Sequence, residues 1–148
     1  MVLRDYHVDN LMWLPDRLGI RRVGLLDFQD ALSGSPIYDL VSLLEDVRRD
    51  VNLDLASEMK EYYLATQLLK SDDFETVYSI LGAQRNTKIL GIFARLWKRD
   101  RKTQYLKLIP RTWHLLDRSL ETDALEPVHQ WFSEHFTSSY KTLPYQVN

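Results

Sequence analysis

Three oxygen-bearing side chains near the amino end of the sequence have the types and spacing needed for metal binding and base catalysis. Asp5 precedes Asn10 in one short polar segment, and Asp27 directly follows the apolar run Val23-Gly24-Leu25-Leu26. Phosphoryl transfer requires a carboxylate that orients the attacking hydroxyl and accepts its proton, together with a few hard oxygen ligands for Mg²⁺. The three side chains therefore predict phosphoryl-transfer chemistry.

A β-hairpin is expected to bring these side chains to one end. Residues 11–14 and 22–26 are short apolar segments typical of strands, and Pro15-Asp16-Arg17-Leu18-Gly19 between them is typical of a turn. Asn10 lies just before the first segment and Asp27 just after the second. Because the two ends of a hairpin meet, we expect Asn10 and Asp27 to lie close together.

Three motifs occur in order along the first 40 residues: Arg4-Asp5-Tyr6-His7-Val8-Asp9-Asn10, Leu26-Asp27-Phe28-Gln29-Asp30-Ala31 and Gly34-Ser35-Pro36-Ile37-Tyr38-Asp39-Leu40. Their order and spacing resemble the aminoglycoside phosphotransferase (choline kinase-like) superfamily. That superfamily has roughly His-Gly-Asp-x-His-x-x-Asn, then Ile-Asp-Phe-Gly/Gln-Asp, then Pro-x-x-Asp-Leu. The usual His two residues before the catalytic Asp is Leu3 here.

The resemblance implies a role for each member of the cluster. Asp5 would be the catalytic base, Asn10 and Asp27 would hold Mg²⁺, and ATP would donate the phosphoryl group to a small-molecule hydroxyl. Asp39 would tie the start of the following helix to the catalytic loop.

The neighbouring polar residues are interpreted as structural support of the site. We expect Arg4 and His7 to orient the loop by hydrogen bonding, and Asp9 to be a loop carboxylate rather than a metal ligand. Asp30 has two interpretations, a hydrogen bond to the loop or a contribution to a second metal ion, and we favour the first.

The rest of the sequence is dominated by helical periodicity. The predicted fold is mainly α, the helical carboxy-terminal lobe of a protein-kinase-like fold with one small β-hairpin near the amino end. One predicted helix buries the stripe Leu40, Leu43, Leu44, Val47 and Val51. A second begins at Asp54 and places Leu55, Met59, Tyr62, Tyr63 and Leu69 on one side. Further helices are expected over residues 74–99, 103–109, from Pro110 with Trp113, Leu116 and Leu120, and after Glu126-Pro127.

Two cations interrupt the apolar face of the predicted helix 74–99. Arg85 and Lys88 lie between its two apolar parts, where a charge is costly unless it is paired or faces a wet cavity. An internal salt bridge and a substrate or phosphate pocket both fit this pattern. Arg95, on the same side, fits either. The three residues are our candidates for substrate binding.

A closer resemblance involves Gln84-Arg85-Asn86-Thr87-Lys88, Gly91-Ile92-Phe93-Ala94-Arg95-Leu96 and Ile109-Pro110-Arg111. These segments are similar to bacterial cell-wall sugar kinases, which phosphorylate the anomeric hydroxyl of N-acetylmuramate and N-acetylglucosamine. The resemblance covers residues 1–136, which we expect to form the catalytic and substrate lobe, and residues 137–148 are expected to be a flexible tail. The sequence contains neither a Gly-rich phosphate loop nor a strand-borne Lys, so the amino-terminal nucleotide lobe is expected to be absent.

Composition narrows the other possibilities. The formal net charge of −2 over 148 residues gives no general reason to expect nucleic acid or an anionic membrane as partner. The absence of Cys excludes disulfides and thiolate chemistry and fits a cytoplasmic protein. No apolar run approaches the ~20 residues of a membrane span, and charged Arg4 and Asp5 argue against a signal peptide.

Two alternative functions remain open at this stage. A truncated, non-catalytic helical domain could keep the motifs as scaffold and bind a protein partner; the missing nucleotide elements favour it and the intact acidic set opposes it. A kinase of another small alcohol, such as an aminoglycoside or choline, would carry the same motifs.

Overall fold

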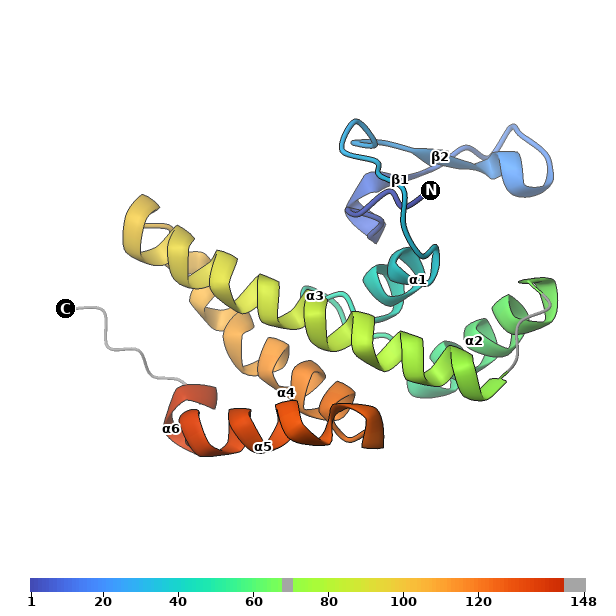
Figure 1. The fold of residues 1–148 in the computed structure, drawn as a ribbon. Coiled ribbons are helices and arrows are strands. Elements are labelled where there is room, and N and C mark those ends of the chain that lie inside the picture. The colour runs from blue at the N-terminus through green and yellow to red at the C-terminus, as the bar shows by residue number, and fades with distance from the viewer. Residues whose placement is uncertain (68–70, 143–148) are drawn as a thin grey trace. The chain divides into compact units, whose positions relative to one another are not determined.

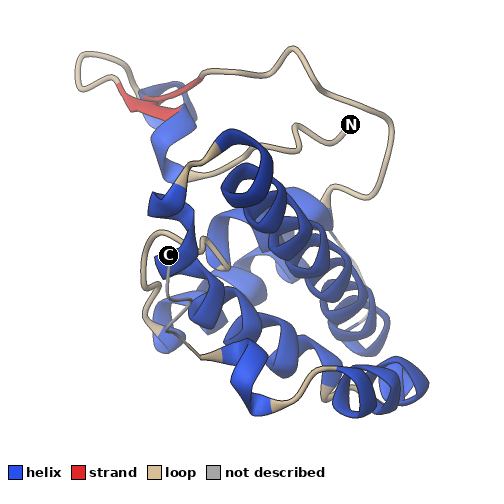
Figure 2. Ribbon diagram, turned by 90° about the vertical axis from the view of Figure 1, so that its left-hand side faces the viewer, coloured by secondary structure: helices blue, strands red, loops and turns tan. Residues whose placement is uncertain are grey.

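The computed structural model describes residues 1–67 and 71–142, and helices predominate in it (Figures 1 and 2). The chain forms two compact units, Met1–Tyr62 and Tyr63–Asn148. The first unit contains the short 3-10 helices Val8–Asn10 and Gly19–Arg22, the strands β1 (Leu11–Trp13) and β2 (Val23–Leu25), the helix α1 (Ile37–Leu44) and the start of α2 (Leu53–Gln67).

The described part of the second unit contains helices and no strand. Its elements are α3 (Ser71–Asp100), α4 (Ile109–Leu120), α5 (Glu126–His135), α6 (Ser138–Lys141) and the 3-10 helices Thr103–Leu108 and Asp123–Leu125. No helix among residues 1–67 and 71–142 is both long and apolar enough to cross a membrane.

The hairpin is present as predicted. Strands β1 and β2 pair antiparallel, with Leu11 opposite Leu25 and Trp13 opposite Val23. The connection turns at Gly19, whose φ of +58° is a conformation that glycine adopts readily. Alternation predicts that one of two neighbouring strand residues faces a core, but Met12 and Trp13 are 45% and 64% exposed. The expectation that one of the two faces a core is therefore wrong, and neither strand contains a buried residue.

Helix α1 is shorter than its apolar periodicity predicts. It ends at Leu44, and Glu45 already has the non-helical angles φ −113° and ψ 41°. The carboxylate of Asp46 then accepts the backbone N–H of Arg48 at 3.0 Å, a local bond that competes with helical hydrogen bonding. Val47 is still buried, at 1% exposure, but it is outside the helix. The predicted continuous helical stripe to Val51 is therefore wrong beyond Leu44.

Helix α2 forms where predicted but does not bury the predicted side. None of its residues is buried, and Leu55 and Tyr62 are 49% and 66% exposed. Leu69, which the sequence also placed on this side, lies outside the described residues. Helical periodicity thus identified the element correctly and its burial incorrectly.

The core of the second unit lies where α3 packs on α4. Trp113, Leu116 and Leu120 of α4 are buried as predicted, the last two completely. The rings of Phe132 and Phe136 pack against Trp113, with centroids 5.9 and 5.2 Å away. Helix α6 was not predicted; Lys141 at its end binds the carboxylate of Asp117 at 2.7 Å. Residues 143–148 of the expected tail lie outside the described residues.

The polar interruption of α3 consists of Arg85 and Asn86 instead of Arg85 and Lys88. Arg85 and Asn86 are buried, at 6% and 0% exposure, whereas Lys88 is exposed. The buried face runs through Phe74, Tyr78 and Asn86 in steps of one or two turns. Lys88 follows Asn86 by two residues and so points to the opposite side of the helix. Its predicted place in the buried stripe is wrong.

Helix α1 holds the segment that precedes Asp5. The carboxylate of Asp39, in the first turn, accepts the backbone N–H of Leu3 at 2.7 Å and that of Arg4 at 3.0 Å. Ser42 donates its hydroxyl to the Arg4 carbonyl oxygen at 3.3 Å. Arg4 has the left-handed φ of +74°, a conformation that needs such support. These bonds fix the direction in which the chain enters Asp5.

The first prediction contrasts a buried leucine with an exposed one. Leu120→Ala should lower the free energy of unfolding by about 2–5 kcal/mol, because it leaves a cavity at a completely buried position. Leu55→Ala, on the exposed side of α2, should change it by less than about 1 kcal/mol. Urea denaturation of both variants measures the difference, and equal losses would contradict the exposure of this side of α2.

The second prediction concerns the Asp39 carboxylate. Asp39→Ala should cost about 3–6 kcal/mol of unfolding free energy, because it removes two charge-assisted hydrogen bonds from backbone donors. Asp54→Ala is the matched control, since Asp54 is also an acidic residue in the first turn of a helix. Its loss should not exceed about 1 kcal/mol. Equal effects in thermal unfolding would reduce the role of Asp39 to a helix-dipole contribution.

Candidate active site

Asp5 lies at the surface, directly after the segment held by Asp39. Its backbone carbonyl accepts the N–H of His7 at 3.1 Å and the side-chain amide of Asn10 at 2.9 Å. Its carboxylate is exposed and, among the described residues, accepts no hydrogen bond. The main chain of Asp5 is therefore fixed while its carboxylate can bind a ligand, which is the arrangement a catalytic base requires.

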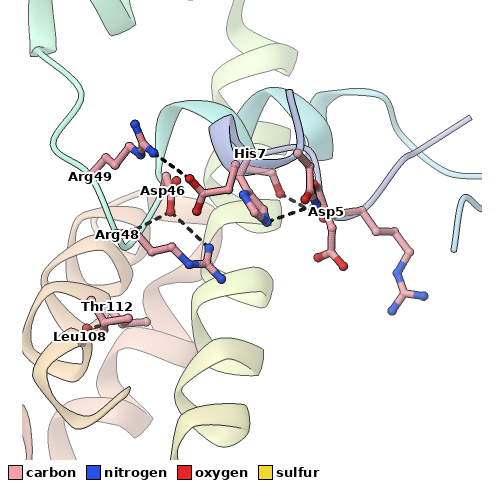
Figure 3. A network of polar contacts seen from close by, with 11 residues as sticks. Asp5, His7, Asp46, Arg48, Arg49, Leu108 and Thr112 are labelled. Carbon is pink, nitrogen blue, oxygen red and sulfur yellow. Dashed lines mark hydrogen bonds and ion pairs between the residues drawn. The ribbon is translucent and has the colours of Figure 1, made fainter. Parts of the chain in front are cut away.

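Asn10 joins the loop to the hairpin through both its main chain and its side chain. Its N–H donates to the His7 carbonyl at 2.9 Å, and its own carbonyl accepts the N–H of Leu26 at 2.9 Å. Its side-chain nitrogen lies 2.9 Å from the Asp5 carbonyl oxygen and 3.4 Å from His7 Nε2. Figure 3 shows the ring of His7 directed toward the segment at Asp5. Asn10 is thus tied to both sides of the candidate site.

The register of the hairpin brings Asp27 to the same end as Asn10. Leu11 pairs with Leu25, so the hydrogen bond from Leu26 to Asn10 extends the ladder by one residue, and Asp27 comes next. Asp27 has the left-handed φ of +56° and is exposed. One of its carboxylate oxygens accepts the side-chain amide of Gln29 at 2.5 Å. Asp5, Asn10 and Asp27 therefore belong to one hydrogen-bonded end of the hairpin, as the sequence predicts.

Asp9 is occupied by a different partner. Its carboxylate binds the Arg49 guanidinium at 2.7 Å, and this hydrogen bond lowers the pKa of Asp9 below its ordinary value (Figure 3). A carboxylate that is bound to a cation and has a lowered pKa is a weaker base than a free one. Asp9 is therefore a loop carboxylate in this structure, as expected, and Asp5 is the better placed base.

The supporting residues differ in what they contact. Asp39 binds the backbone before Asp5, which is the contact that the resemblance implies. His7 approaches Asn10 with Nε2, while its buried Nδ1 has no hydrogen-bond partner among the described residues. Burial, and secondarily the charge of Asp39, raises the pKa of neighbouring Tyr6. The Asp30 side chain is exposed and makes no hydrogen bond within the described residues, so its supporting role stays a prediction.

Three functional contacts were missed by sequence reasoning. Ser42, on the carbonyl of Arg4, could have been found, because it follows Asp39 by three residues and so lies on the same helical face. Gln29, on Asp27, is only two residues from its partner. Arg49 had no local signal, because it is 40 residues from Asp9 along the chain.

The proposed substrate-binding cations belong to the second unit. Arg85 is buried, and Lys88 and Arg95 are exposed. A cavity of about 330 Å³ in that unit has none of them in its wall. It is lined mainly by apolar groups from α3, α4, α5 and α6, among them Gly91, Trp113, Phe132 and Tyr140. Such a wall does not offer the hydrogen bonds that a sugar needs, so this cavity is not a candidate sugar site. The substrate roles of the three cations stay predictions.

The donor set at the hairpin fits Mg²⁺ in number and kind. Within residues 1–67 and 71–142, no three His, Cys, Asp or Glu side chains cluster as a metal site. Asn10 and Asp27 would supply two oxygen ligands, and Mg²⁺ is commonly bound by one or two protein oxygens together with phosphates and water. The arrangement therefore suits Mg²⁺ held by two side-chain oxygens and by ligands from outside the protein.

Comparisons with known proteins agree with this chemistry. Residues 1–79 match the profile described as the phosphotransferase enzyme family. The chain is 45% identical over 133 residues to the N-acetylmuramate/N-acetylglucosamine kinase of Caulobacter vibrioides, a match covering 89% of this chain and 37% of the relative. It is 43% identical over 124 residues to the kinase of the same name from Neisseria meningitidis, covering 79% and 36%. For the kinase of that name from Pseudomonas aeruginosa the values are 36% over 126 residues, covering 80% and 36%.

The extent of these matches decides what they show. The chain spans little more than a third of the length of these curated relatives. The helical fold with one small hairpin agrees with the predicted carboxy-terminal lobe of a kinase-like protein. The family profile covers more than half of the 148 residues and includes Asp5, Asn10, Asp27 and Asp39. We conclude from this coverage that the chain belongs to the phosphotransferase enzyme family.

Proposed function

We propose that this chain carries the catalytic base and the metal ligands of an ATP-dependent kinase that phosphorylates a hydroxyl of an amino sugar. The observation that carries the proposal is the hydrogen-bonded end of the hairpin. There Asp5 has a fixed backbone and a carboxylate without a hydrogen bond among the described residues, its carbonyl binds Asn10, and Asp27 follows Leu26, whose N–H binds the Asn10 carbonyl. The motif order and the names of the relatives support the reaction class.

The chemistry follows from the positions of the side chains. Asp5 would orient the sugar hydroxyl and accept its proton as the oxygen attacks the γ-phosphorus of ATP, the bond from that phosphorus to the β–γ bridging oxygen breaks and ADP leaves. Asn10 and Asp27 hold Mg²⁺, which neutralises the charge of the phosphates when it is bound. Asp39 and Ser42 maintain the loop geometry, so that little reorganisation is needed when substrate arrives.

The substrate assignment rests on similarity to the curated relatives. Their printed names support N-acetylmuramate and N-acetylglucosamine as substrates, and we infer that the anomeric hydroxyl is phosphorylated in cell-wall recycling in the cytoplasm. Arg85, Lys88 and Arg95 are proposed to contact the sugar or the transferred phosphate. The nucleotide lobe is proposed to come from sequence other than these 148 residues.

The third prediction is that the 148-residue chain alone binds ATP·Mg²⁺ weakly and turns over sugar negligibly. Its sequence contains no Gly-rich loop and no strand-borne Lys to cover the phosphates, so it offers the nucleotide chiefly metal-mediated contacts. Isothermal titration calorimetry of the purified chain measures this affinity. Micromolar binding of ATP would show that the chain contains a nucleotide site of its own.

The fourth prediction tests the base in a chimera, in which this chain replaces the matching segment of the Caulobacter vibrioides kinase. Asp5→Asn should lower kcat by about 10²- to 10⁴-fold with a smaller change in KM, because the proton acceptor is lost while the size is kept. Asp9→Asn, at the carboxylate bound to Arg49, is the control and should retain most activity. If Asp9→Asn were the more damaging change, the base would have been assigned to the wrong carboxylate.

The fifth prediction tests the metal ligand in the same chimera. Asp27→Asn should raise the Mg²⁺ concentration needed for half-maximal rate by at least about tenfold. Loss of a residue that only hydrogen-bonds to a metal ligand already lowers metal affinity about 10- to 100-fold. Asp30→Asn, a neighbouring exposed carboxylate, should leave this concentration nearly unchanged. An equal shift in both variants would indicate a diffuse electrostatic effect, or a second metal at Asp30, instead of one ligand at Asp27.

A further inference from the structure

The side chain of Asn10 can serve a cation in only one of its two orientations. An amide presents an oxygen on one side and an NH₂ group on the other, and only the oxygen can hold a metal ion. The orientation is fixed by the groups around the amide. Two such groups are within reach of its nitrogen, the carbonyl oxygen of Asp5 at 2.9 Å and Nε2 of His7 at 3.4 Å.

The Asp5 carbonyl determines which end of the amide lies in this place. A carbonyl oxygen only accepts hydrogen bonds, so the atom 2.9 Å away must be the NH₂ nitrogen of Asn10. If the amide were flipped, its oxygen would face the Asp5 carbonyl oxygen and repel it. The observed orientation leaves Oδ1 of Asn10 without a hydrogen bond among the described residues.

The same reasoning determines the state of the His7 ring. Because Nε2 faces an NH₂ group, it must be the accepting nitrogen, and a neutral ring then carries its proton on Nδ1. Nδ1 is buried and has no hydrogen-bond partner among the described residues. The ring therefore makes its hydrogen bond in the loop through Nε2, to Asn10 (Figure 3).

We propose that His7 is a positioning residue for the metal site. The Asp5 carbonyl accepts one amide hydrogen of Asn10 and His7 accepts the second. Together they fix the orientation of the amide, so that Oδ1 is available to a divalent cation. This inference rests on the proposed function, because it takes Asn10 to be a metal ligand. It assigns to His7 a specific hydrogen bond, whereas a general role in loop packing would require only the shape of the ring.

Nitrogen NMR on the isotopically labelled 148-residue chain tests the geometry without any ligand. The expected result is a proton on Nδ1 of His7 and an Nε2 resonance that is typical of an accepting nitrogen. Exposed His114 serves as the internal reference for an unconstrained ring. A His7 ring protonated on Nε2 would overturn the proposal, because that nitrogen could not accept a hydrogen from Asn10.

Binding of Mn²⁺ tests the consequence for the metal. Paramagnetic broadening of the Asn10 and Asp27 amide signals is followed as Mn²⁺ is added to the parent chain, His7→Gln and His7→Phe. Gln can place an accepting oxygen where Nε2 lies, whereas Phe keeps a ring without an acceptor. His7→Phe should bind Mn²⁺ about 10- to 100-fold more weakly, as is usual when a residue behind a ligand is lost. His7→Gln should retain most of the affinity, and His114→Phe should match the parent.

The outcomes separate this proposal from the proposed function. Mn²⁺ binding by His7→Phe equal to that of the parent, or a His7→Gln variant as weak as His7→Phe, would overturn the positioning role and leave the metal site intact. Failure of Mn²⁺ to broaden Asn10 and Asp27 in the parent would overturn the metal assignment, and the positioning role with it. Should His7→Phe not fold, the ring protonation of the parent and the Mn²⁺ affinity of His7→Gln decide the question.

Discussion

The carboxylate of Asp39 makes the contact on which the position of the candidate base depends. It binds two consecutive backbone N–H groups, those of Leu3 and Arg4, from the first turn of α1. Hydrogen bonds to a charged acceptor contribute about 1.5–3 kcal/mol each. The left-handed conformation of Arg4 costs on the order of 1–3 kcal/mol. The two bonds together outweigh that cost, so the strained turn into Asp5 is maintained.

The hairpin supplies the second constraint on the site. Its antiparallel register fixes Leu26 opposite Asn10 and therefore determines where Asp27 emerges. A shift of one residue would turn every side chain of the strand to the other face. The strands contain no buried residue, so the register is held by backbone pairing and by the hydrogen bond at Asn10 instead of by a packed core. A short and exposed element can thus position a candidate metal ligand, provided that its end is fixed to the loop that contains Asp5.

The second unit shows how burial can depart from an amphipathic pattern. The buried part of α3 includes Asn86 and Arg85, whereas Lys88, the cation that the sequence placed in the same stripe, is exposed. Apolar periodicity identifies a helix from the spacing of residues along the chain. Where polar residues interrupt the apolar face, however, the direction of that face around the helix axis is ambiguous. Only the packing of α3 on α4 resolves that direction.

The sequence alone determined the motif residues, the hairpin, the main helices and the resemblance to the phosphotransferase family, because each depends on short-range patterns of residue type. Tertiary structure decided the pairing of Asp9 with Arg49, the early end of α1 at Leu44 and the exposure of α2. These features depend on contacts between residues that are distant in the chain, or on competition between local hydrogen bonds and helix formation. Periodicity carries no information about either, since it records only which positions along one element are apolar.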